Sequence, residues 1–201
     1  MIHNVWNYPV GVYDDLFKPN EFADIIEKLD QTHLERKKAI DSFDYFNVPD
    51  WIQPLTNKMQ IIFDMFCQEA NIKNIYSPNF YQTQRTEHYG RHNAFYGNWE
   101  PHNDIYERAN WSVSFYPRVD TESVLPDGYV GGELALMDRL DYSCYPDSVQ
   151  LVGVKSYRVI IFSPLKVHRI RPYFGKTPRL SITQHYGREV CEINPDDSKM
   201  L

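Results

Sequence analysis

The sequence predicts an α+β fold that is mainly β, built as a two-sheet jelly roll or small barrel with helices packed outside one sheet. Helical periodicity is confined to the first third of the 201 residues. From residue 75 the chain changes to short segments rich in Val, Ile, Tyr, Phe and Thr, which Pro, Gly, Asn and Asp separate. About eight such segments at short spacing are typical of a closed or two-sheet antiparallel architecture.

Two helices are predicted from apolar residues at helical spacing. The first stripe follows a helix start at Pro19-Asn20-Glu21 and comprises Phe22, Ile25, Ile26 and Leu29. The second stripe comprises Leu55, Met59, Ile62, Phe63 and Phe66. Pro54 stands near the beginning of this second helix and Asn71 near its end, where each residue is favoured. We expect both stripes to face the core.

Strands and loops alternate in the rest of the chain. We expect strands near residues 80 to 88, 101 to 106, 111 to 117, 132 to 137, 149 to 154, 157 to 163, 166 to 171 and 179 to 186. The long loops 85 to 100 and 118 to 131 are expected to be mobile and to line the mouth of a site as lids. We expect one domain over residues 1 to 201, with a helical lead-in at about 1–74, a β core at about 75–187 and a short tail at 188–201.

Composition limits the function classes. With 21 Lys and Arg against 27 Asp and Glu, the net charge of −6 disfavours nucleic acid and anionic membranes as partners. Three widely separated cysteines, Cys67, Cys144 and Cys191, form neither a disulfide framework nor a Cys-x-x-Cys pair. Without a signal peptide or a membrane-spanning stretch, the expected location is cytoplasmic or otherwise intracellular. A small-molecule or peptide substrate is the expected partner, and the sequence does not indicate an oligomeric state.

The pair His102 and Asp104 is the first candidate metal motif. Residues two apart in a strand point to the same face, so both side chains can reach one ion. With a distant histidine, they would form the two-histidine, one-carboxylate triad of non-haem Fe(II) oxygenases. A second match, His33-Leu34-Glu35, lies in a helical stretch, where residues two apart diverge, and we interpret it as a solvated face.

His168 is the best candidate for the third ligand, with His185 as its competitor. His168 follows an apolar strand, and Arg179-Leu180-Ser181 comes eleven residues later. Arg179 and Ser181 share a strand face, and a guanidinium beside a hydroxyl suits a carboxylate. Iron with open positions beside a buried arginine describes a binding place for a 2-oxo acid.

These motifs resemble the 2-oxoglutarate- and Fe(II)-dependent oxygenase superfamily, whose pattern is His-x-Asp, a later His, and an Arg or Lys about ten residues on. Supporting matches are Gly131-Gly132-Glu133-Leu134, Phe162-Ser163-Pro164 and Arg171-Pro172. The lead-in Val12-Tyr13-Asp14-Asp15-Leu16-Phe17 is similar to that of the prolyl 4-hydroxylase-like branch. The resemblance implies a double-stranded β-helix of about eight strands.

The resemblance also implies the roles of individual residues. His102, Asp104 and His168 would hold Fe(II), Arg179 would bind the distal carboxylate of 2-oxoglutarate and Ser181 would support it. The co-substrates would be 2-oxoglutarate and O2, with ascorbate as a candidate reductant, and no catalytic residue is expected beyond the metal ligands. The reaction would hydroxylate a peptidyl or free amino-acid side chain and release succinate and CO2.

Some choices stay open at the level of sequence. Prolyl hydroxylases often hold the co-substrate with a tyrosine, but Tyr89 and Tyr96 lie at the wrong distance upstream of His102. Nucleobase demethylases carry a second arginine six residues after the first, where this chain has His185. Two other functions remain: a jelly-roll binding module without turnover, and a cupin-type metal enzyme that does not use 2-oxoglutarate.

Overall fold

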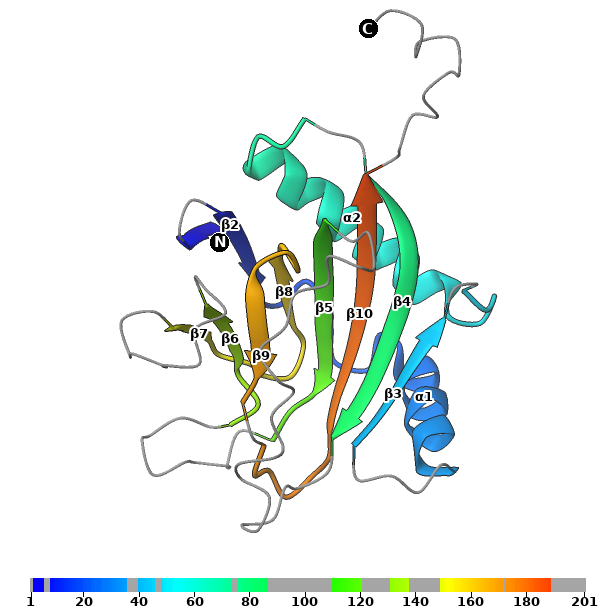
Figure 1. Ribbon diagram of the computed structural model, residues 1–201. Helices are drawn as coiled ribbons and strands as arrows, with labels where there is room; N and C mark the ends of the chain where they lie inside the picture. The colour runs from blue at the N-terminus through cyan, green and yellow to red at the C-terminus, as the bar shows by residue number, and fades with distance from the viewer. Residues whose placement is uncertain are drawn as a thin grey trace, which may run out of the picture.

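The computed structural model describes residues 2–5, 8–35, 40–45, 48–73, 76–86, 110–120, 131–137, 149–171 and 173–188. These residues form two antiparallel sheets and two helices (Figure 1). The larger sheet has the order β1-β2-β8-β5-β10-β4-β3, with bounds Ile2–Val5, Tyr8–Tyr13, Arg158–Phe162, Trp111–Arg118, Arg179–Arg188, Tyr76–Thr86 and Ile40–Tyr45. The smaller sheet has the order β7-β6-β9, with bounds Val149–Val152, Leu134–Met137 and Val167–Ile170. The helices are α1 (Ala23–Glu35) and α2 (Gln53–Glu69).

The prediction of a mainly β fold is confirmed. The strands expected near 80 to 88 and from 111 to 186 correspond to β4 through β10, with small differences at their ends. The strand expected at 101 to 106 and most of both expected loops lie outside the described residues. None of the helices in the described ranges is long and apolar enough to span a membrane.

The expectation that the first third is helical was incomplete, because β1, β2 and β3 also lie there. The segment of β2 contains Pro9 and Gly11, which have low strand propensity. It becomes a strand by pairing with β8, for example Gly11 with Ile161 and Tyr13 with Val159. Such pairing joins segments almost 150 residues apart, so local sequence patterns do not indicate it.

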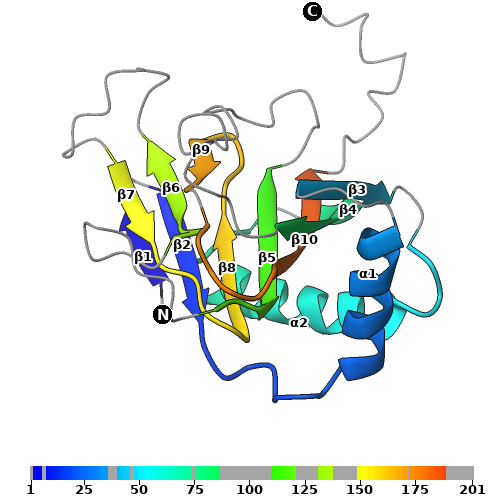
Figure 2. The same ribbon diagram turned by 90° about the horizontal axis from the view of Figure 1, so that it is seen from below.

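Helix α2 covers one face of the larger sheet (Figure 2). Pro54 lies in its first turn, and Asn71, just past its end, adopts a left-handed φ of 54°. The predicted apolar stripe is buried, as expected. Phe63 stacks on Tyr186 of β10 with ring centroids 4.0 Å apart, and Phe66 meets Trp111 of β5 edge-on at 5.2 Å.

Helix α1 packs on the same face near β4. His33 of this helix is 1% exposed, and its Nε2 lies 2.9 Å from the Thr83 hydroxyl. The interpretation of His33 as part of a solvated face was therefore wrong, although Leu34 and Glu35 are exposed. A strand hydroxyl facing the helix satisfies the buried imidazole.

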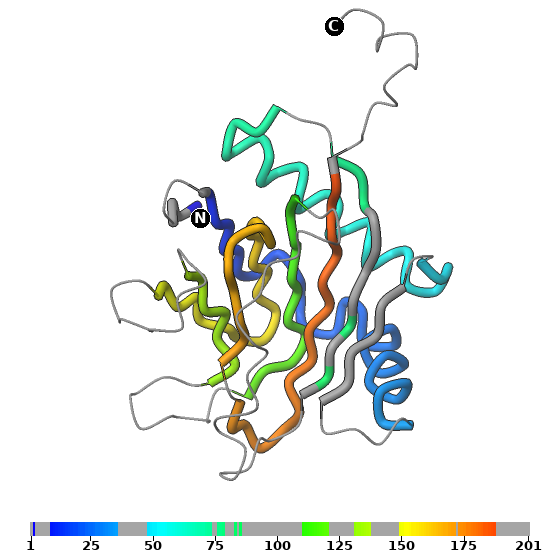
Figure 3. Tube along the Cα trace, viewed as in Figure 1, coloured from blue at the N-terminus to red at the C-terminus, as the bar shows by residue number. Residues whose placement is uncertain are grey.

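The central strands β5 and β10 run side by side, although they lie far apart in the sequence (Figure 3). Their alternate side chains serve two different environments. Trp111, Val113, Phe115, Ile182 and Tyr186 belong to the apolar cluster under the helices. The intervening residues face the opposite side, where the smaller sheet contributes Leu134 and Leu136 to a second apolar cluster. The polar residues of the candidate site lie on this second face.

Candidate functional site

Arg179, the first residue of β10, is the central charged group of the second face. Its side chain is 1% exposed, and its guanidinium carbon lies 4.9 Å from the ring centroid of Tyr116. The guanidinium and the Tyr116 side chain also interact electrostatically. Burial lowers the pKa of Arg179, and nearby Tyr116, Tyr173 and Glu133 oppose this effect. A bound anion would offset the desolvation of this cation.

Tyr116 is a site residue that the sequence reasoning did not assign. Arg118 of β5 pairs with Leu180 of β10, whereas Phe115 pairs with Ile182, so β5 has one extra residue between them. This irregularity is a β-bulge, and it contains Pro117, which cannot donate a ladder hydrogen bond. The bulge allows Tyr116 to face the inside while Arg118 faces the helices. The signal in the sequence was the Tyr116-Pro117 dipeptide inside a strand of alternating pattern.

Gly131 and Gly132 bring the backbone against Arg179. Gly132 has a φ of 74°, and a Cβ added to it would lie 3.2 Å from Cδ of Arg179 and 3.1 Å from Cδ2 of Tyr173. The backbone N–H of Gly131 donates to Oε1 of the buried Glu133 at 2.7 Å. Both the positive φ and the close approach require glycine, which gives the Gly-Gly-Glu stretch a physical reason.

Ser181 lies on the same face of β10 as Arg179 and is buried. Two residues further along this face, the Thr183 hydroxyl lies 2.9 Å from the Ser114 hydroxyl on β5. Ser114 and Tyr116 lie two residues apart on the same face of β5. A row of hydroxyl groups therefore continues from the guanidinium along the inner face of the two strands.

His168 of β9 faces the second side from the smaller sheet. It pairs with Leu136, and its ring meets Phe162 edge-on with centroids 5.1 Å apart. Its Nδ1 lies 2.8 Å from the backbone carbonyl of Lys166. Because a carbonyl only accepts, Nδ1 carries the proton and Nε2 carries the lone pair. Histidines that ligate metals are commonly oriented in this way by a backbone carbonyl.

His185, the competitor of His168, also faces this side. Its Nδ1 lies 3.0 Å from the hydroxyl of Ser112, which can either donate or accept. Burial, and then the neighbouring His168, lower the pKa of His185 to about 3, so the imidazole is neutral at physiological pH. The backbone contact that fixes the tautomer of His168 favours His168 as the ligand.

The other predicted metal ligands, His102 and Asp104, lie outside the described residues. Within the described ranges, no group of three or more His, Cys, Asp or Glu side chains is placed to hold a metal ion. The described part of the site nevertheless fits the expected groups. His168 presents an imidazole lone pair, a ligand that suits iron, and the buried Arg179 with Ser181 and Tyr116 suits a carboxylate.

Comparison with solved structures identifies the fold. An oxidoreductase of the 2OG-Fe(II) oxygenase family from Burkholderia pseudomallei matches with a TM-score of 0.59 and 15% identity, over 89% of this chain and 84% of that chain. A prolyl hydroxylase from Trichoplax adhaerens, in complex with a peptide fragment of the hypoxia inducible factor oxygen degradation domain, matches with a TM-score of 0.61 and 13% identity, over 90% of this chain and 84% of that chain.

A third similar structure is the epimerase SnoN in complex with Fe3+, alpha ketoglutarate and nogalamycin RO. It matches with a TM-score of 0.62 and 12% identity, over 89% of this chain and 78% of that chain. No protein-family model matches the sequence, and no curated protein matches it. The chain has the fold of the 2-oxoglutarate- and Fe(II)-dependent oxygenases, so the resemblance predicted from the sequence is confirmed at the level of the fold.

The close contact at Gly132 leads to a stability prediction. Gly132→Ala should destabilise the protein by about 1–3 kcal/mol, because alanine is strained at positive φ and its methyl group would press on the side chains of Arg179 and Tyr173. Gly153→Ala is the matched control, since its Cβ would approach nothing closer than the flexible end of Arg158 at 3.6 Å. Urea denaturation of both variants measures the difference, and equal stabilities would contradict the role given to Gly132.

Proposed function

We propose that this protein is a 2-oxoglutarate- and Fe(II)-dependent dioxygenase that hydroxylates a peptidyl or free amino-acid side chain. The observation that carries the proposal is the buried guanidinium of Arg179, placed between the sheets beside Ser181 and Tyr116. A buried cation with hydroxyl groups on one strand face is the chemistry that binds the distal carboxylate of a dicarboxylic 2-oxo acid.

The proposed roles follow from the chemistry of each side chain. His102, Asp104 and His168 would hold iron, which when bound supplies the O2 activation coupled to oxidation of 2-oxoglutarate to succinate and CO2. The Lys166 carbonyl keeps Nδ1 of His168 protonated, so Nε2 is the ligating atom. Arg179 and Ser181 would orient the co-substrate, with Tyr116 holding the guanidinium in position. Phe162 and Leu136, which lie beside His168 in the apolar cluster, would limit the access of water.

The similar structures and the charge of the chain bear on the substrate class. Prolyl hydroxylases are among the similar structures, and one of them is bound to a peptide. The net charge of −6 and the histidine at position 185 argue against nucleic acid. The epimerase among the similar structures belongs to the same fold, and a reaction without oxygen insertion is therefore the second outcome to distinguish.

The iron prediction concerns the third ligand. His168→Ala and Asp104→Ala should each weaken Fe(II) binding strongly, because each removes one of three protein ligands. His185→Ala, which removes a neighbouring imidazole from the same interior, should retain iron. Anaerobic calorimetric titration with Fe(II) compares the three variants. Unchanged iron binding in His168→Ala together with a loss in His185→Ala would transfer the third ligand to His185.

The co-substrate prediction concerns Arg179. Arg179→Ala should weaken 2-oxoglutarate binding on the order of a hundredfold or more, because the carboxylate then lacks its charged partner. Arg179→Lys should retain part of the affinity, since it keeps the charge and loses the planar fork. Tyr116→Phe should cost less than Arg179→Ala, because the charge remains. Affinity is measured without O2 in the presence of iron, and equal affinities in all variants would direct the search to Arg171.

The reaction prediction concerns turnover. A screen of peptides and amino acids should reveal substrate-stimulated release of succinate that depends on both iron and 2-oxoglutarate. Mass spectrometry of the product separates hydroxylation, which adds one oxygen atom, from epimerisation, which leaves the mass unchanged. Metal-dependent turnover without 2-oxoglutarate would support the cupin-type alternative, and ligand binding without turnover would support the binding module.

A further inference from the structure

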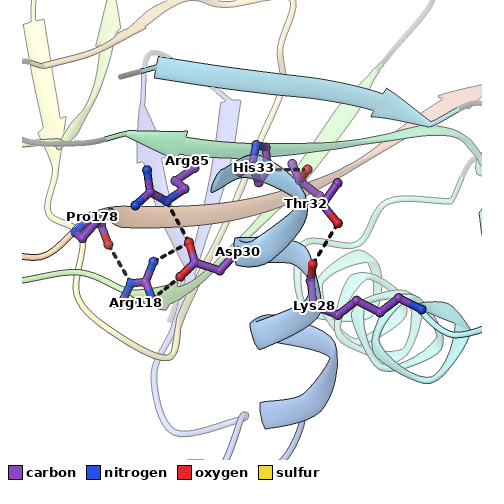
Figure 4. Close-up of polar contacts among 8 residues, drawn as sticks. Lys28, Asp30, Thr32, His33, Arg85, Arg118 and Pro178 are labelled. Atoms are coloured by element: carbon purple, nitrogen blue, oxygen red, sulfur yellow. Dashed lines mark hydrogen bonds and ion pairs between the residues drawn. The ribbon is translucent and has the colours of Figure 1, made fainter. Parts of the chain in front are cut away.

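Asp30 of helix α1 joins two arginines that come from the strands on either side of β10 (Figure 4). Nε of Arg85 on β4 donates to Oδ1 of Asp30 at 2.8 Å. Arg118 on β5 forms a two-pronged contact, with Nη1 2.8 Å from Oδ2 and Nη2 2.8 Å from Oδ1. One carboxylate of a helix outside the sheet therefore links β5 and β4, the two strands that flank β10.

The register places this ion-pair cluster across the beginning of β10. Leu180 pairs with Arg85 on one side and with Arg118 on the other. Leu180 shares its face with Ile182, which packs under the helices, so Asp30 spans β10 at this residue. The residues that flank Leu180 are Arg179 and Ser181, and they point to the opposite face. The cluster therefore lies on one face of the sheet at Leu180, and the proposed co-substrate residues Arg179 and Ser181 lie on the opposite face at the same place.

A second contact restrains the backbone just before Arg179. Nε of Arg118 donates to the carbonyl of Pro178 at 2.7 Å. Upstream, the carboxylate of Asp120 accepts the backbone N–H of Lys176 at 2.6 Å. Since Arg118 contacts both Asp30 and Pro178, the orientation of its guanidinium depends on the helix, and the entry of β10 depends on that guanidinium.

The cluster is charged and largely removed from water. The side chains of Arg85, Asp30 and Arg118 are 6%, 16% and 33% exposed. Burial alone would raise the pKa of Asp30, but the hydrogen bonds and charges of Arg118 and Arg85 outweigh it and lower the pKa. Removing the carboxylate would leave two partly buried cations close together without their counter-ion, which is far more disruptive than loss of an exposed pair.

We propose that Asp30 is a positioning residue for the co-substrate site: acting through Arg118 and Arg85, it fixes residues 178 to 181 so that Arg179 and Ser181 are aligned for the carboxylate of 2-oxoglutarate. This inference rests on the proposed function. A guanidinium displaced by a fraction of an ångström to an ångström loses the aligned geometry on which binding of a carboxylate depends.

The chain offers a matched control for this role. Asp14 forms a similar two-pronged pair with Arg158, with Nε 2.8 Å from Oδ1 and Nη2 2.9 Å from Oδ2. This pair joins the segment after β2 to β8, and β5 separates β8 from β10 in the sheet. Asp14→Asn therefore removes the same chemistry from a place where no co-substrate residue depends on it.

The test compares Asp30→Asn, Arg118→Lys and Asp14→Asn with the wild-type protein. We expect Asp30→Asn to weaken 2-oxoglutarate binding roughly tenfold, equivalent to about 1.4 kcal/mol, with Fe(II) affinity unchanged. Arg118→Lys, which keeps a charge for Asp30 and loses the fork, should lie between Asp30→Asn and wild type. Asp14→Asn should lower the melting temperature without changing either affinity. Unchanged 2-oxoglutarate affinity in both Asp30→Asn and Arg118→Lys would overturn the proposal.

Amide hydrogen exchange of the ligand-free protein separates this inference from the proposed function. Faster exchange at residues 176 to 181 in Asp30→Asn, but not in Asp14→Asn, would support the positioning role even before 2-oxoglutarate is added. Equal exchange in both variants would overturn it. Failure of the wild-type protein to bind 2-oxoglutarate would overturn the proposed function instead, and the exchange result would still decide whether Asp30 holds the strand.

Discussion

The candidate site depends on the register of β10, because the alternate side chains of this strand serve two incompatible environments. Ile182 and Tyr186 pack into the apolar cluster under the helices, whereas Arg179 and Ser181 face the other side. A shift of one residue would exchange the two sets and place a guanidinium among aromatic rings. The same register must therefore satisfy the hydrophobic core and the chemistry of the site, so the two cannot vary independently.

Burial of polar groups is the main cost of this arrangement, and local partners offset much of it. The Arg179 guanidinium contacts Tyr116, the Ser112 hydroxyl contacts His185, and a hydrogen bond joins Ser114 to Thr183. Hydroxyl groups suit this task because they donate or accept as needed. They do not supply a full negative charge, however, and a buried cation gains most from an anion. Besides the buried Glu133 near Arg179, the proposed carboxylate ligand would supply such an anion.

The bulge at Pro117 connects the two faces of the sheet. Proline cannot complete the ladder, so β5 accommodates an extra residue there and changes which side chains point inward. Tyr116 consequently reaches the guanidinium on one face, while Arg118 reaches Asp30 and the Pro178 carbonyl on the other. A single irregularity in one strand couples the helical layer to the position of the site.

Local patterns in the sequence were sufficient for the helices and for most strands. The stripe of α2 and its boundary residues Pro54 and Asn71 were predictable, because helical spacing and capping preferences act within a few residues. The strands from β4 onward were predictable from short β-branched and aromatic segments between turn residues. The placement of Arg179 and Ser181 on the same face of one strand was predictable as well, since strand alternation is a local property.

The sequence alone thus determined the fold class, its main elements and the candidate arginine and histidine of the site. The tertiary structure decided which distant partners they meet: β2 became a strand through β8, and His33 was buried by Thr83. It also placed Tyr116 against the guanidinium of Arg179. Asp30 meets arginines that lie 55 and 88 residues away in the chain. Contacts of this kind form only when the sheet register brings the strands together, because their energy comes from long-range pairing and burial and not from local conformational preference.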